Sequence, residues 1–423
     1  MSATAAQLYF LIQRLRGGVR PGMIERARRL LDSPQDSMRD HVLDRLVALH
    51  GPEARQPEWL SHQPLVERST LFPQFRALAS APPAVRVERR RTSGSTGTPF
   101  SFLKDLEMVS WMDAAMWAAY AWHGIAPGQR HARFWGMPLT PGARLKRQGR
   151  DRLLNRRRLD AFRLNRQSAE RFFFGLRRFG AQYAYGYPTL MRTFVEHCTA
   201  VGLAGTDLGI RVVVSTGEML TPDTRQMIGD FFGARVVNEY GCTESGIVAM
   251  ECEAGTPHAI PVAVLAEVVD PTGMRVEHGH PGEVVVSDLY GRVLPFLRYR
   301  LHDRAVTQTA GCACGRHLPS IKTESGRIDC FIQTPARGAI YDAVLAYSVP
   351  AQVQRFRATQ TALDRLEVKI VAGAGFDRAT TPDECRRRWE GVLGPGMSVD
   401  VQVVDDISYE VSGKLRYFVP LSS

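Results

Sequence analysis

Apolar residues near the N-terminus repeat at the spacing of an α-helix. Two series carry this spacing: Leu8, Leu11, Ile12 and Leu15, then Leu43, Leu46 and Leu49. Such a pattern places apolar side chains on one face of a helix. We therefore expect residues 1–80 to form a helical N-terminal layer of a larger domain. A helix lying on a membrane surface is the alternative.

The middle of the chain alternates between short β-rich runs and helical stretches. The clearest β-rich runs cover residues 211–215, 234–238 and 282–287. A helix is expected between the first two, because Thr221 and Pro222 mark its start and Asp223 lies in its first turn. This alternation is typical of layered α/β proteins. It predicts a large multi-layer α/β domain over residues 81–327.

The last part of the chain has the pattern of a small α+β domain. Strands are expected at 353–360, 366–371 and 399–404, with a helix at 381–393. A unit of this size, residues 328–423, is large enough for a mobile lid but small for an independent enzyme.

The composition excludes several classes of protein. Hydrophobic residues make up 44% and charged residues 23%, which is close to the globular average. We find no run of the about 18 apolar residues that a membrane span needs, and the apolar stretch 8–12 lacks a signal-peptide pattern. Seven cysteines among 423 residues do not make a disulfide scaffold. A cytoplasmic protein is expected.

Basic residues exceed acidic ones, and the formal charge of +11 favours anionic partners. Thirteen lysines and arginines lie between Arg144 and Arg178, interleaved with leucine and phenylalanine. Amphipathic helices with solvated arginine faces explain this segment. The alternatives are a phosphate-rich cosubstrate, an anionic membrane surface or a polyanion. No nucleic-acid fold signature accompanies the segment, so no nucleic-acid partner is expected.

A loop rich in glycine and hydroxyl residues is the sharpest local signal. Its members are Thr92, Ser93, Gly94, Ser95, Thr96, Gly97 and Thr98. Glycines let the backbone fold around an anion, and N–H groups and hydroxyls donate to phosphate oxygens. The loop lacks the lysine of the GxxxxGK[ST] motif. By itself it is either a phosphate-binding loop or an ordinary turn.

Six other blocks follow this loop in order: VVSTGEMLTP at 213–222, NEYGCTE at 238–244, GEVVV at 282–286, PFLRYRLHD at 295–303, GRID at 326–329 and SGKL at 412–415. This ordered set resembles the acyl-adenylate-forming superfamily of acyl-CoA synthetases, peptide-synthetase adenylation domains and luciferases. Within it the chain most resembles the phenylacetate–coenzyme A ligase branch and its CapK-like relatives. The short N-terminal region, the Glu-Tyr-Gly-x-Thr-Glu form and the Cys-x-Cys-Gly-Arg segment carry that closer match. The resemblance covers residues 70–423.

The resemblance implies a two-step reaction with ATP and Mg²⁺. A carboxylate and ATP would give an acyl-adenylate and pyrophosphate, and the acyl group would then pass to a thiol or an amine. Residues 92–98 would hold the β- and γ-phosphates. Thr243 would bond the α-phosphate, and Glu244 would ligate Mg²⁺, a hard cation that suits a carboxylate.

The same resemblance implies the rest of the nucleotide site. Gly217 and Glu218 would line the adenine slot, Tyr240 would stack on adenine, and Asp303 would accept both ribose hydroxyls. The remaining members are Asn238, Glu239, Gly241 and Arg327. Each assignment has a simpler rival: Glu244 could merely start a helix, Asp303 could be a turn residue, and Tyr240 could belong to the core.

A mobile lid is also implied. Asp329 matches the hinge, and Lys414 matches the catalytic lysine, whose long side chain could bridge the carboxylate and the α-phosphate. Lid rotation would then remove Lys414 and admit the acceptor. The alternative is a surface lysine in a glycine turn.

The chain departs from the family pattern at several positions. Thr98 stands where many relatives carry lysine, so Arg91 and Lys104 are candidates for the missing charge. His302 occupies the usual glycine site before Asp303. The segment 333–338 lacks the usual coenzyme A-tunnel sequence.

One cysteine–histidine pair and one cysteine–cysteine pair together predict a metal site. Cys252 and His258 are six residues apart, and Cys312 and Cys314 are two apart. Three thiolates and one imidazole complete a tetrahedral zinc set, which would be structural because no position stays open. Four unrelated reduced residues are the alternative.

The leading hypothesis is an aryl acid–coenzyme A ligase, with coenzyme A as a possible cosubstrate and Trp135, Tyr185 and Tyr187 in an aromatic substrate pocket. The same rings could instead fill an ordinary core. A second hypothesis transfers the acyl group to an amine or hydroxyl in polysaccharide or natural-product assembly. A third is an inactive binding module of the adenylate-forming fold. The chain is expected to be a monomer or a homodimer.

Overall fold

The computed structural model describes residues 3–67, 70–71, 85–91, 101–135, 141–160, 164–308, 311–327, 331–408 and 415–421. Two compact units are present. The first contains Met1–Gln129 and Val237–Glu324, and the second contains Arg130–Val236 and Ser325–Ser423. Each unit therefore combines two separate stretches of chain. The expected boundaries at residues 80 and 327 stay a prediction.

The first unit begins with helices. Their bounds are α1 (Ala3–Arg16), α2 (Pro21–Leu31), α3 (Gln35–His50), α5 (Leu106–Tyr120) and the short η1 (Pro52–Arg55) and η2 (Ala121–His123). The antiparallel hairpin of β1 (Val87–Arg91) and β2 (Ser101–Asp105) lies before α5 in the chain. Asp105 ends β2 and caps α5, because its side chain accepts a hydrogen bond from the Met108 N–H.

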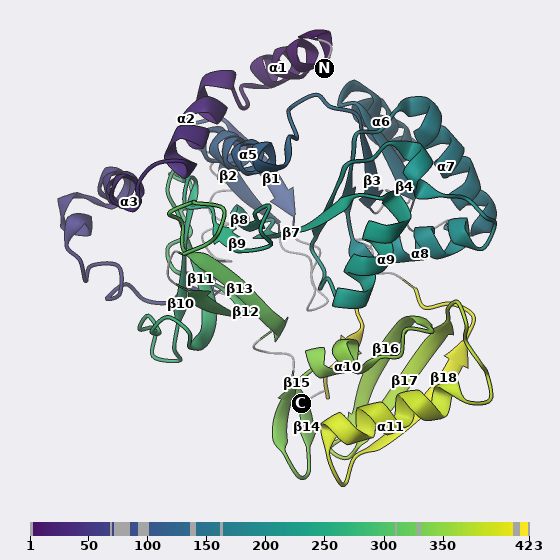
Figure 1. The fold of residues 1–423 in the computed structure, drawn as a ribbon. Coiled ribbons are helices and arrows are strands. Elements are labelled where there is room, and N and C mark those ends of the chain that lie inside the picture. Colours follow the sequence, from purple (N-terminus) through teal and green to yellow (C-terminus); the bar gives the residue numbers. More distant parts are fainter. Residues whose placement is uncertain are drawn as a thin grey trace. The chain divides into compact units, whose positions relative to one another are not determined.

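The remaining strands of this unit lie side by side in a sheet (Figure 1). Their order is β10 (Val264–Val269), β11 (Pro281–Asp288), β12 (Tyr299–Gln308), β13 (Ser320–Arg327), β9 (Pro257–Ala259), β8 (Gly246–Glu251) and β7 (Arg235–Cys242). The core beneath contains β-branched and aromatic side chains such as Val284, Val286 and Phe296.

The second unit contains a parallel sheet in the order β6 (Val212–Thr216), β5 (Tyr183–Gly186), β3 (His131–Trp135) and β4 (Arg156–Asp160). Every residue of β6 is buried, as a central parallel strand requires. The helices of this part are α6 (Pro141–Leu153), α7 (Arg166–Phe179), α8 (Pro188–Thr199), the short η4 (Gly205–Leu208) and α9 (Pro222–Phe232). Helices α7, α8 and α9 pack on the sheet through Phe172, Phe194 and Phe232, respectively.

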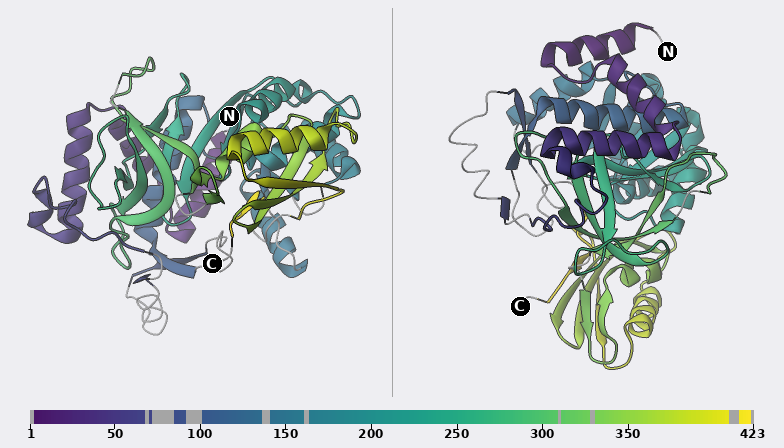
Figure 2. Two further views of the ribbon diagram at one scale, coloured as in Figure 1. Left: turned by 90° about the horizontal axis from the view of Figure 1, so that it is seen from below. Right: turned by 90° about the vertical axis from the view of Figure 1, so that its left-hand side faces the viewer.

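The C-terminal stretch of this unit forms a smaller sheet, in the order β18 (Ser398–Val404), β17 (Arg365–Ala372), β16 (Val353–Ala362) and β19 (Phe418–Val419). Figure 2 shows α11 (Thr381–Leu393) along one face of it, where Trp389 is fully buried. A hairpin of β14 (Phe331–Thr334) and β15 (Gly338–Tyr341) and the short α10 (Ala343–Ser348) precede these strands.

The predicted α/β class with a small C-terminal α+β part is confirmed, and the helix at 381–393 has the expected bounds. One local expectation was wrong: the run 156–158 lies on strand β4 instead of a helix. On α1, Leu8, Leu11 and Leu15 are exposed, and Tyr9 is buried and accepts a hydrogen bond from the Trp117 indole. Within the described ranges, no helix has the length and hydrophobicity needed to cross a bilayer.

A buried ion pair joins distant parts of the first unit. Lys104 on β2 and Asp288 at the end of β11 are 1% and 0% exposed and form a salt bridge. Asp288 also accepts the Phe296 N–H at 3.0 Å, and the Lys104 ammonium lies 4.0 Å from the centre of the Phe296 ring. Burial lowers the pKa of Lys104 and raises that of Asp288, while each charge opposes the shift of its partner.

We predict that Lys104→Met lowers the free energy of unfolding by about 3–5 kcal/mol, because it leaves the Asp288 carboxylate buried without its counter-charge. Denaturant unfolding measures this change. Lys322→Met is the matched control, because Lys322 lies exposed on β13 of the same unit. The double variant Lys104→Met/Asp288→Asn should recover part of the loss, because asparagine removes the unpaired charge and keeps an acceptor for the Phe296 N–H. A single variant as stable as the control would contradict the account.

Candidate functional site

Strand β7 carries four of the predicted nucleotide-binding residues of the first unit: Asn238, Glu239, Tyr240 and Gly241. A turn that contains Thr243, Glu244 and Ser245 joins β7 to β8. No helix begins in this turn, so the simpler interpretation of Glu244 as a helix start is wrong. On β7, Glu239 accepts a hydrogen bond from the Tyr120 hydroxyl at 2.6 Å, and the Asn238 N–H donates to Glu251 at 2.7 Å.

Tyr240 and Asp303 are in direct contact. The Tyr240 hydroxyl donates to Asp303 Oδ2 at 2.8 Å, and the Tyr240 ring is only partly buried. Asp303 lies inside strand β12, so it is not a turn residue. The structure therefore brings together the side chains predicted to stack on adenine and to bind ribose. Those two roles stay predictions.

The turn that contains Glu244 is held from several directions. The Tyr299 hydroxyl lies 3.4 Å from Glu244 Oε1, and the Tyr299 ring stacks on Phe296 with 4.7 Å between centroids. Arg90 donates to the Thr243 carbonyl at 3.3 Å. Ser245 Oγ lies 3.5 Å from Asp288 Oδ1. The buried ion pair therefore lies directly beneath this turn.

Lys104 cannot supply the charge expected at the phosphate loop. Its ammonium is buried against Asp288, so the expectation based on its place in the sequence was wrong. Only the backbone of Arg91, at the end of β1, lies among the described residues.

Two carboxylates surround His302, next to Asp303. The backbone of His302 has φ 58°, a left-handed conformation that favours glycine. Its Nε2 lies 3.1 Å from Glu67, and its Nδ1 lies 3.4 Å from Glu283. Arg300 pairs with the same two carboxylates. The sequence marked His302 as unusual, but no motif identified Glu67 or Glu283.

In the second unit, the predicted substrate-pocket residues also lie together. The Trp135 ring stacks on Tyr187 and on Tyr185, with centroid distances of 4.1 and 5.6 Å. Trp135 ends strand β3 and Tyr185 lies near the end of β5, at the carboxyl edge where α/β sheets bind ligands. The Arg133 guanidinium lies over both rings, at 4.9 and 4.7 Å. Burial raises the pKa of Tyr187, so its hydroxyl stays protonated.

Gly217 and Glu218 follow strand β6. Gly217 has φ 76°, which explains glycine at that position. The Glu218 carboxylate accepts hydrogen bonds from the Thr189 hydroxyl at 2.5 Å and from the Leu415 N–H at 2.9 Å. Sequence reasoning identified Glu218 but missed Thr189, which belongs to none of the recognised motifs.

Several predicted residues lie outside the described part of the chain. They are the phosphate-loop residues Thr92 to Thr98, the hinge residue Asp329 and the lysine Lys414. For Arg327 only the backbone, at the end of β13, is described. Their roles stay predictions.

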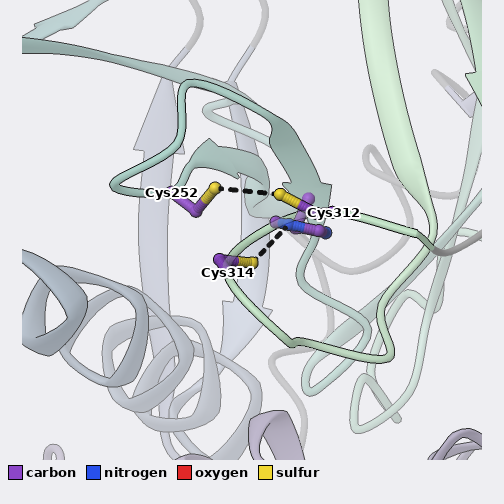
Figure 3. A group of neighbouring side chains, drawn as sticks. Cys252, Cys312 and Cys314 are labelled. Atoms are coloured by element: carbon purple, nitrogen blue, oxygen red, sulfur yellow. Dashed lines mark hydrogen bonds between the residues drawn. The ribbon is translucent and has the colours of Figure 1, made fainter.

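The four predicted metal ligands converge in the first unit, and Figure 3 shows Cys252, Cys312 and Cys314 of this group. The ligand atoms of all four residues lie within 4.8 Å of one another. Cys252 Sγ is 3.6 Å from Cys312 Sγ, and Cys314 Sγ is 3.2 Å from His258 Nε2. His258 Nδ1 lies 2.9 Å from the Leu318 carbonyl, which fixes the proton on Nδ1 and leaves Nε2 to face the sulfurs.

An ion pair lies beside this Cys/His group. Arg316 donates to Glu253 at 2.9 Å, and its guanidinium lies 4.3 Å from the centre of the Trp122 ring. Burial opposes ionisation of Cys312, but hydrogen bonds involving Thr256, Cys314 and His258 lower its pKa to about 6. A thiolate is therefore accessible at neutral pH.

Comparisons with known proteins match this architecture. A family model described as AMP-binding enzyme matches residues 160–289, which include the Thr243–Glu244 turn. A second model, the CapK C-terminal domain, matches residues 333–420. The chain belongs to the acyl-adenylate-forming superfamily, in its CapK- and phenylacetate–coenzyme A ligase-like branch.

Individual members of the superfamily are distant. Protein CapK of Staphylococcus aureus is 21% identical over 343 residues, covering 78% of this chain and 73% of that protein. A phenylacetate-coenzyme A ligase of Pseudomonas putida is 30% identical over 121 residues, but the match spans only 27% of this chain and 28% of the ligase. A crystal structure of 2-hydroxyisobutyryl-CoA ligase has a TM-score of 0.72 at 18% identity, covering 93% and 91% of the two chains. That similarity confirms the fold of the superfamily.

Proposed function

We propose that this chain activates an aryl, phenylacetate-like carboxylic acid with ATP and transfers the acyl group to coenzyme A. The observation that carries the proposal is the Tyr240–Asp303 contact beside the Thr243–Glu244 turn. That arrangement offers an aromatic face for a base, a carboxylate for ribose hydroxyls and a second carboxylate for a cation, all within the first unit.

The chemistry requires charge control at the α-phosphate. A carboxylate oxygen attacks the α-phosphorus, the bond to the bridging oxygen breaks, and pyrophosphate leaves with the electron pair. The acceptor then attacks the acyl carbon and AMP leaves. Thr243 would donate to the α-phosphate and Lys414 would offset the repulsion between the two anions. Glu244 would hold Mg²⁺, which neutralises phosphate charge when bound.

The acceptor has a second candidate. The match of residues 333–420 to the CapK C-terminal domain supports keeping an amine or hydroxyl acceptor as the alternative to coenzyme A. The segment 333–338, which departs from the usual tunnel sequence, lies in the matched region. Both acceptors require the same first half-reaction, formation of the acyl-adenylate. Either one is therefore incompatible with the third hypothesis, an inactive binding module.

An anionic membrane contact of the basic segment 144–178 also stays a prediction. Helix α6 exposes Leu145 and Leu153 among its basic residues.

A screen of carboxylic acids for ATP–pyrophosphate exchange tests the proposed reaction. With the correct acid, the enzyme should release AMP and pyrophosphate. Glu244→Gln should lower kcat about 10²-fold without unfolding the protein, because one charge is lost at the transition state. Glu277→Gln, an exposed carboxylate in the same unit, is the control. Stoichiometric ADP would contradict the proposal.

We also propose that Cys252, His258, Cys312 and Cys314 bind a structural zinc ion. Tetrahedral zinc with Zn–S near 2.3 Å and Zn–N near 2.0 Å places its ligand atoms about 3.5–3.8 Å apart. The 3.6 and 3.2 Å separations lie close to this range. Four protein ligands leave no open position, so the ion would stabilise the fold and take no part in the chemistry.

Metal analysis of the purified protein should find about one zinc per chain, because the four ligands form one closed site. Cys312→Ser should lose the ion and unfold at a lower temperature, since metal-binding energy is folding energy. Cys242→Ser, in the same unit but outside the group, should keep it. A metal-free wild-type protein of unchanged thermal stability would rule the site out.

A further inference from the structure

We propose that Glu218 is a positioning residue for adenylation that fixes the backbone of Leu415, the residue that follows Lys414 in the chain. This inference rests on the proposed function and adds a role to a residue expected only to line the adenine slot. All the residues that carry it belong to the second unit. They link the loop after β6, the start of α8 and the C-terminal segment.

The Glu218 carboxylate uses its two oxygens for two different partners. Oε2 accepts from the Thr189 hydroxyl at 2.5 Å and from the Thr189 N–H at 3.3 Å. Oε1 accepts from the Leu415 N–H at 2.9 Å. Thr189 is in the first turn of α8, where the helix dipole favours a negative charge. The helix therefore fixes the carboxylate, and the carboxylate fixes the backbone of Leu415.

Leu415 directly follows Lys414 in the chain. Its side chain is buried with Val371 and Ile407. Arg357 donates to the Arg416 carbonyl at 3.0 Å and to the Ser408 carbonyl at 2.7 Å. Residues on both sides of the 409–414 segment are thus tied to β16. Glu218 adds a connection from Leu415 to the loop that begins at Gly217.

A second group of contacts joins α8 to β16. Arg192 is 7% exposed and donates to the carbonyls of Ala351 at 2.7 Å and Val353 at 3.1 Å. Glu196 pairs with Arg192 at 3.0 Å and accepts a hydrogen bond from Gln354. Because α8 contacts the C-terminal stretch through several residues, loss of the Glu218 contact should release the Leu415 backbone without releasing β16.

Substitution of Glu218 has a specific chemical consequence. Glutamine keeps the shape, but an NH₂ group replaces one of the two carboxylate oxygens and places a donor against the N–H of either Thr189 or Leu415. Thr189→Val removes the hydroxyl that fixes the carboxylate and leaves the Leu415 N–H unchanged. Thr193→Val is the matched control, because the Thr193 hydroxyl donates to the Thr189 carbonyl of the same helix and not to Glu218.

Hydrogen exchange of the peptide that contains residues 415–420 tests the contact independently of activity. The Leu415 amide should exchange roughly tenfold or more faster in Glu218→Gln and Thr189→Val, as loss of a hydrogen bond to a charged group allows. Thr193→Val should exchange like the wild type. Unchanged protection of this amide in both variants would overturn the proposal, whether or not the protein forms adenylates.

Kinetics then test the coupling to Lys414. Glu218→Gln should slow pyrophosphate exchange about tenfold or more, while acceptor consumption of chemically supplied acyl-adenylate stays near the wild-type rate. In a Lys414→Ala background, Glu218→Gln should cause little further loss, because its effect acts through the lysine. The proposal would be overturned if Glu218→Gln slowed both half-reactions equally. It would also be overturned if the effects of Glu218→Gln and Lys414→Ala on the rate of pyrophosphate exchange were fully additive. If the wild-type enzyme shows no ATP–pyrophosphate exchange, the proposed function is refuted. The hydrogen-exchange experiment alone then decides whether Glu218 fixes the Leu415 backbone.

Discussion

The buried pair of Lys104 and Asp288 is the constraint on which the first unit depends. It joins the hairpin that precedes α5 to the end of β11, and Asp288 also receives the Phe296 N–H. Charges are costly to bury, and a pair is tolerated only where its hydrogen bonds are satisfied. The turn with Glu244 rests on this arrangement through Ser245 and through the Phe296–Tyr299 stack. A position expected to contact phosphate therefore has a structural role beneath the site.

A similar arrangement recurs in both units: a charged side chain fixes a loop that carries proposed chemistry. In the first unit, Glu67 and Glu283 hold His302 in a left-handed conformation next to Asp303. In the second, Thr189 fixes Glu218, which fixes Leu415. Such supporting contacts restrict the geometry of groups that must act within a fraction of an ångström. They also explain why substitutions that touch no ligand can change a rate.

The sequence predicted the strand-forming runs and the helix 381–393 because periodicity and turn residues are local signals. It also brought Cys252, His258, Cys312 and Cys314 together correctly, because few residue types form such a set. It did not reveal that the leucines of α1 are exposed, since periodicity defines an apolar stripe but not whether another element covers it. Asp288 lies 184 residues from Lys104, and Leu415 lies 197 residues from Glu218, so only folding reveals these two contacts.

Formation of an acyl-adenylate is the central claim, and transfer of a heavy oxygen isotope tests it most directly. The carboxylic acid is labelled in its carboxylate, and AMP is analysed by mass spectrometry after turnover with the acceptor. Attack of a carboxylate oxygen on the α-phosphorus leaves that oxygen on AMP once the acyl carbon is transferred. The account predicts one labelled oxygen in each AMP released. Unlabelled AMP, or label found in free phosphate, would contradict it.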